Sequence, residues 1–328
     1  MSYKNIVLVS CADKKEFFCR MRDFLCQRNG TYDYSTTGIG WTLHDSSYAA
    51  DEDNPAVNDW IVIKSTGENG KEDIYLQIKW TTNGISVYGW LYWNNSTHAG
   101  VHQYGSSSSM TVAESGSYEL SVYGDLSFII IIESSNTTYD YLAYAGCVIN
   151  QVYDNTVAIS AGALSSGSDV TISLDAVPAS WYVGQRIFIR DDAGIDIITI
   201  KSISGNDITA DLSSNYAAGC KLRADFPYVV NNIATSMNGY AMIGHNSTVA
   251  LSYSAVYNTN YQTSADPDAL NADYFGAPID LAGTDSYFGQ LPHVWTVSST
   301  GLTEKAAFDN GYRFFKIYTS FYLAIEEV

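Results

Sequence analysis

The apolar run Leu126-Ser-Phe-Ile-Ile-Ile-Ile132 decides how the first half of this chain folds. Its length suits a buried β-strand and is far below the roughly 20 apolar residues that a membrane-spanning helix needs. From Gly38 onward the neighbouring segments also alternate with a period of two, which is typical of strands with one buried face. The run therefore predicts a core strand of a sheet and not a membrane helix.

Further strand patterns lie on both sides of this run. Trp60–Ser65 and Asp73–Trp80 flank a glycine-containing segment, so we expect them to form a β-hairpin. Residues 48–58, which contain several acidic residues and a proline, are expected to form a loop. The strands expected in this first unit are 41–44, 60–65, 73–80, 85–93, 118–123, 126–133 and 139–148, preceded by a strand or extended arm over 3–10.

One long helix is predicted ahead of these strands. Asp13 is its expected N-cap, and Glu16 follows at the spacing of a capping box. The sequence Asn29-Gly30 is the expected end of the helix. One apolar stripe recurs at helical spacing and consists of Phe17, Phe18, Met21, Phe24 and Leu25.

The sequence pattern changes after the first unit. Short β patterns separated by tight turns succeed each other over 155–224, and five or six such strands predict a small β-barrel. After this segment the pattern of the first unit returns. We therefore expect a β-rich α+β fold in which 1–154 and 225–328 form a discontinuous sheet domain with one N-terminal helix, and 155–224 is an inserted small β-barrel.

Residues 258–292 form a long stretch with little periodicity. Loops of this length are rare in compact domains unless they have a function. The stretch is rich in Asp, Ala, Gly, Tyr and Pro, and we expect it to reach across a neighbouring subunit. Its aromatic residues Tyr274, Phe275, Tyr287 and Phe288 are therefore candidate inter-subunit contacts.

The composition favours contact with other protein. There are 26 Tyr against 17 Lys and Arg together, and tyrosine joins a large apolar ring to a hydroxyl that can stay hydrated at a contact surface. The net charge of −18 repels nucleic acid and anionic membrane surfaces, so neither is an expected partner. No signal-peptide pattern is recognised, and we expect synthesis in a cytoplasm.

Positive charge is concentrated at the start of the chain. Residues 1–28 contain six Lys or Arg and three Asp or Glu, a net charge of +3, which leaves −21 for residues 29–328. A basic end on an acidic body can dock onto an acidic neighbour, including another copy of the chain. A solvated helix face is the alternative interpretation.

Cys19 and Cys26 are seven residues apart and share the helix face that lies roughly opposite the apolar stripe. Lys15 and Arg22 flank them, and nearby cations lower the pKa of a thiol. These four residues are candidate inter-subunit contacts. Disulfides between subunits and packing of the two thiols beneath a neighbouring segment are the two alternatives.

Tyr88, Trp90 and Tyr92 alternate along one predicted strand and share one of its faces, with Trp93 on the other. Such a stripe can stack sugars, but it can also pack on the predicted helix or on another subunit. His98 and His102 lie four apart in a segment rich in glycine and serine, so we expect a loop there and no metal site.

Motifs that carry catalytic chemistry are not recognised in this sequence. Nucleophile elbows, phosphate-binding loops and zinc-protease helices are missing. The acidic stretch Asp191–Asp196 lacks the EF-hand pattern, and a hairpin turn is expected there. Scattered carboxylates leave a glycan-degrading enzyme as a third hypothesis. We expect a protein without enzymatic activity and without a cofactor.

The hairpin resembles a pattern found in structural proteins of tailed bacteriophage particles. Asp59-Trp-Ile-Val-Ile-Lys-Ser-Thr-Gly67 continues through Glu68-Asn-Gly-Lys-Glu-Asp-Ile-Tyr-Leu-Gln-Ile-Lys79, which gives an apolar strand, a Ser-x-Gly-x-x-Gly turn and an Ile-Tyr-x-x-Ile strand. The strands 87–93, 126–133 and 139–146 follow in the same order. Val183-Gly-Gln-Arg-Ile-Phe-Ile189, at the entry of the expected barrel, resembles small β modules on such subunits.

The resemblance covers about half of the chain and implies a virion structural protein of the neck or collar, the tail end or the baseplate. Such a subunit is expected to form a ring with other copies of itself and to contact other virion proteins. A carbohydrate- or receptor-binding module of a phage tail is the alternative, with Tyr88, Trp90 and Tyr92 as its stacking platform.

Overall fold

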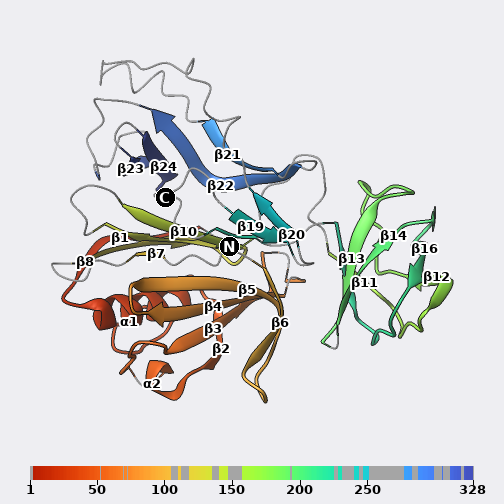
Figure 1. Cartoon of the computed structure of the whole chain (residues 1–328), viewed down its shortest axis with the longest axis horizontal. Coiled ribbons are helices and arrows are strands. Elements are labelled where there is room, and N and C mark those ends of the chain that lie inside the picture. The colour runs from red at the N-terminus through yellow and green to blue at the C-terminus, as the bar shows by residue number, and fades with distance from the viewer. Residues whose placement is uncertain are drawn as a thin grey trace. The chain divides into compact units, whose positions relative to one another are not determined.

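The computed structural model describes residues 3–51, 53–68, 70–71, 73–104, 110–111, 118–134, 140–146, 157–192, 194–224, 228–230, 240–243, 247–250, 277–282, 287–298, 305, 311–318 and 321–327. The chain forms two compact units, one from 1–148 with 227–328 and the other from 149–226 (Figure 1). The fold is β-rich, with several antiparallel sheets and two helices in the described residues.

An antiparallel five-stranded sheet forms the centre of the first unit. Its order is β1 (Lys4–Cys11), β8 (Tyr118–Gly124), β9 (Phe128–Glu133), β10 (Tyr141–Gly146) and β18 (Tyr228–Val230). Every residue of β9 is buried. Since successive side chains of a strand point to opposite faces, the sheet must be covered on both sides at β9. The predicted core strand is confirmed.

A six-stranded sheet covers one of these faces. Its strands are β2 (Thr42–Ser46), β3 (Trp60–Ser65), β4 (Ile74–Thr81), β5 (Gly84–Asn94) and β6 (Ala99–Tyr104), with β7 (Met110–Thr111) paired to β5. The expected hairpin is confirmed, because β3 pairs with β4 from Trp60–Lys79 to Ser65–Ile74. The hydroxyl of Ser65 donates to the carbonyl of Leu126, which ties this hairpin to the turn that precedes β9.

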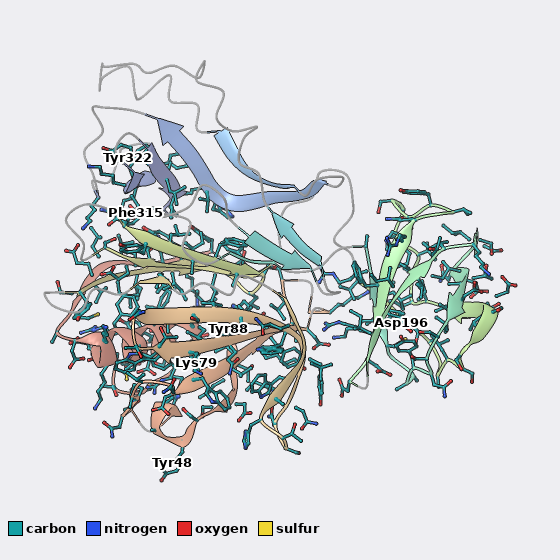
Figure 2. The ribbon with its side chains drawn as sticks, in the orientation of Figure 1. Tyr48, Lys79, Tyr88, Asp196, Phe315 and Tyr322 are labelled. Atoms are coloured by element: carbon teal, nitrogen blue, oxygen red, sulfur yellow. The ribbon has the colours of Figure 1, made fainter. Side chains whose placement is uncertain are left out.

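Strands from the end of the chain cover the opposite face. They form a sheet in the order β21 (Ala277–Ala282), β22 (Tyr287–Ser298), β24 (Phe321–Glu326) and β23 (Tyr312–Tyr318). The imidazole of His293 in β22 lies 5.5 Å from the ring of Phe128. The ring of Phe315 in β23, which is labelled in Figure 2, lies 6.3 Å from that of Tyr123. Figure 1 shows the five-stranded sheet between the other two.

The expectation of a loop over 258–292 is wrong in its second half. Strand β21 and the start of β22 fall within it, whereas 258–276 lie outside the described residues. These strands were not predicted because Pro278 and Gly289, residue types that are rare inside strands, lie within them. Because β21 is an edge strand, it can contain a proline without breaking the sheet. A further hairpin of this unit pairs β19 (Tyr240–Ile243) with β20 (Ser247–Ala250).

Helix α1 (Lys14–Leu25) begins as predicted. Asp13 Oδ1 accepts from the amide of Glu16 at 2.7 Å. Glu16 Oε2 in turn accepts from the amide of Ala12 at 2.8 Å, one residue before the amide that a capping box uses. This arrangement satisfies two of the amides around the helix start.

The helix ends at Leu25, earlier than the predicted stop at Asn29-Gly30. The chain that follows binds the last carbonyl groups of the helix. The amide of Ile39 donates to the carbonyl of Phe24, and the amide of Trp41 donates to the carbonyl of Leu25, each at 2.9 Å. Within the segment 48–58, expected to be a loop, residues Tyr48–Asp51 form a single helical turn, α2.

The second unit contains two sheets around one core. A four-stranded sheet has the order β11 (Ala158–Ile159), β17 (Lys221–Arg223), β13 (Arg186–Arg190) and β14 (Ile195–Thr199). A three-stranded sheet has the order β12 (Gly167–Ser173), β16 (Asp207–Leu212) and β15 (Ser202–Ser204).

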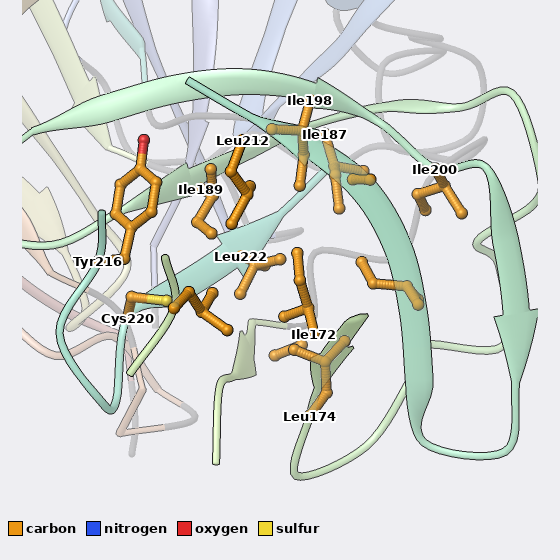
Figure 3. Packing of buried hydrophobic residues seen from close by; sticks show 14 of the residues in the cluster. Ile172, Leu174, Ile187, Ile189, Ile198, Ile200, Leu212, Tyr216, Cys220 and Leu222 are labelled. Atoms are coloured by element: carbon orange, nitrogen blue, oxygen red, sulfur yellow. The ribbon is translucent and has the colours of Figure 1, made fainter. Parts of the chain in front are cut away.

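Isoleucines and leucines from both sheets meet in the interior of this unit (Figure 3). The four-stranded sheet contributes Ile187, Ile189 and Ile198, and the three-stranded sheet contributes Ile172 and Ile208. Among the described strands neither sheet closes on itself, so the expected barrel is not confirmed. Alternation along each strand predicts the core face, but it does not determine whether edge strands pair.

Since the chain forms two compact units, core truncations in each should affect separate unfolding transitions. We expect Ile130→Ala to destabilise only the first unit and Ile187→Ala only the second, each by about 2–5 kcal/mol, because both side chains are fully buried. Urea unfolding followed by tryptophan emission and far-UV circular dichroism measures the two midpoints. Thr42→Ala, at an exposed position of β2, is the control. A single transition shifted equally by both isoleucine variants contradicts the expectation.

Candidate functional site

Aromatic side chains gather on the six-stranded sheet and at the β5–β6 hairpin. This aromatic cluster consists of Trp60, Tyr75, Trp90, Tyr92 and Trp93, with His98 at its edge. Cross-strand pairing explains part of it, because Tyr75 in β4 lies opposite Trp90 in β5. Tyr75 and Trp93 are buried, whereas Trp60, Trp90 and Tyr92 are half-buried and form the accessible rim.

Trp93 is the centre of the cluster. Its ring centroid lies 5.3 Å from that of Trp60 and 5.8 Å from that of Trp90, with interplanar angles of 57° and 64°. Tyr75 and Tyr92 meet edge to face at 5.9 Å. Aromatic pairs in such geometries add about 0.5–1.5 kcal/mol each beyond their burial. Strand alternation predicts Trp93 on the opposite face from Trp90, yet the two rings are in contact.

Gly100 explains why the two indoles meet. It pairs with Trp93 across the β5–β6 hairpin, and a Cβ atom at this position would lie 2.0 Å from Cδ2 of Trp90. The indole of Trp90 therefore lies directly on the backbone of β6, beside Trp93. Only glycine leaves room for this contact.

Polar side chains satisfy the indole N–H groups of Trp90 and Trp93. Trp93 Nε1 donates to Asp45 Oδ2 at 2.6 Å, and Trp90 Nε1 donates to Gln77 Oε1 at 3.2 Å. The same Asp45 oxygen lies 2.9 Å from Nδ1 of His98. Because these donors are used within the chain, the inner part of the cluster is a small packed core. Its half-buried rim is the part that can meet a ligand.

The phenylalanines of α1 find partners elsewhere. Phe18 stacks with Trp80 at 6.3 Å, and Phe24 meets Tyr34 edge to face at 5.5 Å. The predicted stripe of Tyr88, Trp90 and Tyr92 is thus not needed to cover them. Trp90 and Tyr92 pack within their own sheet and hairpin, and Tyr88 remains half-buried.

A second feature is the acidic loop, residues 45–59, which includes α2. It contains five Asp or Glu and no Lys or Arg. Arg22 of α1 binds two residues of this loop. Its Nη1 donates to the carbonyl of Ala50, and its Nη2 donates to Asp53 Oδ1. The same Nη2 lies 2.7 Å from Oδ1 of the neighbouring Asp23. These contacts attach Ala50 and Asp53 of the loop to α1.

Arg22 is 0% exposed, and so is its neighbour Asp23. Burial raises the pKa of Asp23, while Arg22 acts in the opposite direction. Removing one member of such a buried pair costs about 3–5 kcal/mol, since the other charge stays behind. Arg22 is an internal anchor, and its burial does not fit the expected inter-subunit contact. Lys15 does lie at the surface, where its Nζ donates to Asn54 of the acidic loop at 2.8 Å.

Two places expose large apolar side chains. On the acidic loop, Tyr48 is 77% and Val57 46% exposed, and Figure 2 shows Tyr48 pointing away from the body of the first unit. In the second unit, Tyr182 is 53% and Val183 58% exposed. No other large apolar side chain with described burial is exposed in this way. Large exposed apolar groups that lie together mark contact sites on folded proteins.

Tyr182 and Val183 belong to the apolar tip, which we define as residues 177–186. The tip is a tight turn in which the amide of Gln185 donates to the carbonyl of Tyr182 at 3.1 Å. The side-chain oxygen of Gln185 accepts from the amide of Tyr182, also at 3.1 Å, and Gly184 donates to the carbonyl of Ile200 at 2.7 Å. Trp181 is buried in the core of the second unit and holds the base of the turn.

The cysteines of α1 differ from the expectation. Cys19 is only 2% exposed, and burial raises its pKa to about 11 although Arg22 lies nearby. The predicted lowering of this pKa is wrong, and the thiol is packed inside the chain. Cys26 caps the end of α1 and is half-buried. Cys11, Cys19, Cys26 and Cys220, the cysteines within the described residues, form no disulfide.

For the aromatic residues predicted in 258–292, the structure describes the backbone at most. Tyr274 and Phe275 fall outside the described residues. Tyr287 and Phe288 begin β22, where Tyr287 pairs with Ala282, and their side chains are not among the described ones. His102 lies in β6 and not in the expected loop.

The expected hairpin turn in the second unit is confirmed. The amide of Asp191 donates to the carbonyl of Gly194 at 3.0 Å, and Asp191 Oδ1 accepts from the amide of Gly194 at 3.1 Å. Asp196 Oδ2 accepts from the hydroxyl of Tyr216 at 2.7 Å. These oxygens serve the turn and the packing of the strands around it.

In the described part of the chain, no group of three or more His, Cys, Asp or Glu is placed to hold a metal ion. No helix among the same residues is long and apolar enough to cross a membrane. Of the residues discussed above, Tyr48, Val57 and Tyr182 were not singled out from the sequence. The sequence does contain a sign of the apolar tip, namely two apolar residues directly before a glycine.

Comparison with protein-family models and with curated proteins gives no match.

The contact of Trp90 with Gly100 gives a direct test of the aromatic cluster. We expect Gly100→Ala to displace the indole, to lower stability by about 1–3 kcal/mol and to shift tryptophan emission to longer wavelength. Gly162→Ala is the matched control, because a Cβ there meets nothing within 4 Å. Unchanged emission and an unchanged urea midpoint in Gly100→Ala contradict this geometry.

The thiols should differ in reactivity at pH 8. Burial raises the pKa of Cys19 to about 11 and that of Cys11 to about 12, so the thiolate fraction of each is small. Among the three cysteines at the start of the chain, we expect iodoacetamide to modify Cys26 first, and Cys11 and Cys19 only after unfolding in urea. Mass mapping of the cysteine peptides over time measures this order. Labelling of Cys19 as fast as Cys26 in the folded chain contradicts its burial.

Proposed function

We propose that this chain is a non-enzymatic structural subunit of a tailed phage particle. It forms a ring with copies of itself at the neck or collar, the tail end or the baseplate, and contacts other virion proteins there. The observation that carries the proposal is the exposure of large apolar side chains on two surface projections that contacts within the chain hold, the acidic loop and the apolar tip.

Both projections are held in place by the chain itself. The buried Arg22 fixes the acidic loop, and Gln185 with Trp181 fixes the apolar tip. A pre-ordered contact group loses little conformational freedom on binding, so more of its interaction energy becomes affinity. Tyrosine is also one of the side chains that dominate the energy of protein interfaces. These features support an assembly role.

The three stacked sheets of the first unit support the same role. A body whose central sheet is buried on both faces is suited to carry load, because its strands cannot be exposed without breaking the core. The resemblance of the β3–β4 hairpin to phage structural proteins points to the particle.

A carbohydrate- or receptor-binding module of a phage tail is the second candidate. It is favoured by the half-buried rings of Trp60, Trp90 and Tyr92, which lie near the carboxylate of Asp45 and the imidazole of His98. Sugars bind where aromatic faces are combined with a few polar groups. For this function the ligand would bind at the aromatic rim and not at the two projections.

Sedimentation velocity over a wide concentration range, followed by negative-stain electron microscopy, separates the two candidates. We expect the purified chain to associate with rising concentration into closed rings of uniform size. A chain that stays monomeric at the highest concentration, and whose tryptophan emission responds to glycans, contradicts the assembly proposal and supports the second candidate.

A further inference from the structure

The acidic loop and the apolar tip have opposite electrical character. The loop, residues 45–59, has five acidic residues and no basic one. The tip, residues 177–186, has no acidic residue and contains Arg186, whose side chain is exposed. Each has two exposed apolar side chains, Tyr48 with Val57 on the loop and Tyr182 with Val183 on the tip. The two projections are therefore complementary both in apolar surface and in charge.

Symmetry restricts how two copies can use these projections. A two-fold contact that brings loop against loop joins two segments that each have five acidic and no basic residues in their sequence, and like charges in contact are repelled. A contact of tip against tip brings the two exposed Arg186 side chains together. Only the unlike pairing, loop to tip, joins the apolar groups and opposite charges at once. Such a heterologous contact repeats from copy to copy and gives a ring when the rotation closes.

We propose that the acidic loop of one copy binds the apolar tip of the next. Tyr48 and Val57 pack against Tyr182 and Val183, and Arg186 faces the carboxylates of the loop. The partner of this surface is thus a second copy of the same chain. The inference rests on the proposed assembly function and specifies which surfaces meet.

Two variants, each defective in one surface, test this pairing. Tyr48→Ala removes the ring of the loop, and Tyr182→Ala removes that of the tip, and both side chains are exposed, so folding should be unaffected. We expect each variant alone to self-associate about 30-fold more weakly than the wild-type chain. Tyr88→Ala, at a half-buried tyrosine outside both projections, is the matched control and should associate like the wild type.

Mixing the two variants gives the decisive result. The intact tip of Tyr48→Ala can still bind the intact loop of Tyr182→Ala, but the other two surfaces are defective. The mixture should therefore form one-to-one heterodimers and stop there, as measured by sedimentation velocity and native mass spectrometry. Higher salt should weaken these heterodimers, since opposite charges contribute to the contact.

The possible outcomes separate this inference from the function on which it rests. A wild-type chain that assembles into rings, with both single variants assembling equally well, overturns the loop-to-tip contact and leaves the assembly function standing. A mixture that shows no heterodimer also overturns the contact. A wild-type chain that remains monomeric at every concentration overturns both.

Discussion

Burial of β9 on both faces is the constraint on which the rest of the first unit depends. Its isoleucines alternate between the two faces, so no single layer can cover them. The six-stranded sheet, formed by the residues after α1, covers one face, and β22 and β23 from the end of the chain cover the other. The two covering sheets come from the two ends of a unit that is discontinuous in sequence, and the segment 149–226 lies between its two parts along the chain.

A buried carboxylate also ties the end of the chain to the central sheet. Asp140 is fully buried beside β10, and a buried carboxylate is costly unless it is paired or hydrogen-bonded. The segment from the end of the chain supplies the partners: the amide of Lys316 donates to Asp140 Oδ2 at 2.9 Å, and Lys305 Nζ lies 3.8 Å from Asp140 Oδ1. Lys305 also lies 3.1 Å from Glu119 in β8. Packing of the apolar face and neutralisation of this carboxylate thus require the same segment.

The elements that could be predicted from the sequence are those set by local patterns. The β3–β4 hairpin, the start of α1 and the core strand β9 follow from periodicity and turn residues within a few positions. The aromatic cluster could not be predicted in full, because the position of Trp90 depends on Gly100 in a different strand. The absence of barrel closure among the described strands also depends on edge pairing, which no local pattern specifies. In the same way, the burial of Cys19 depends on what packs around α1, and a helical wheel drawn from one helix cannot show this.

The abundance of tyrosine has two structural sources that the sequence alone does not separate. Tyr123 and Tyr144 are fully buried, and the hydroxyl of Tyr123 donates to Glu327 at 3.2 Å, so such residues fill the core while their polar ends are satisfied inside it. Tyr48 and Tyr182 are exposed instead, each on a segment that other residues hold rigid. The number of tyrosines is therefore a weak argument for contact surfaces. The stronger argument is that a few of them are kept outside by ordered backbone, because a fold gains no core packing from holding a large apolar ring in water.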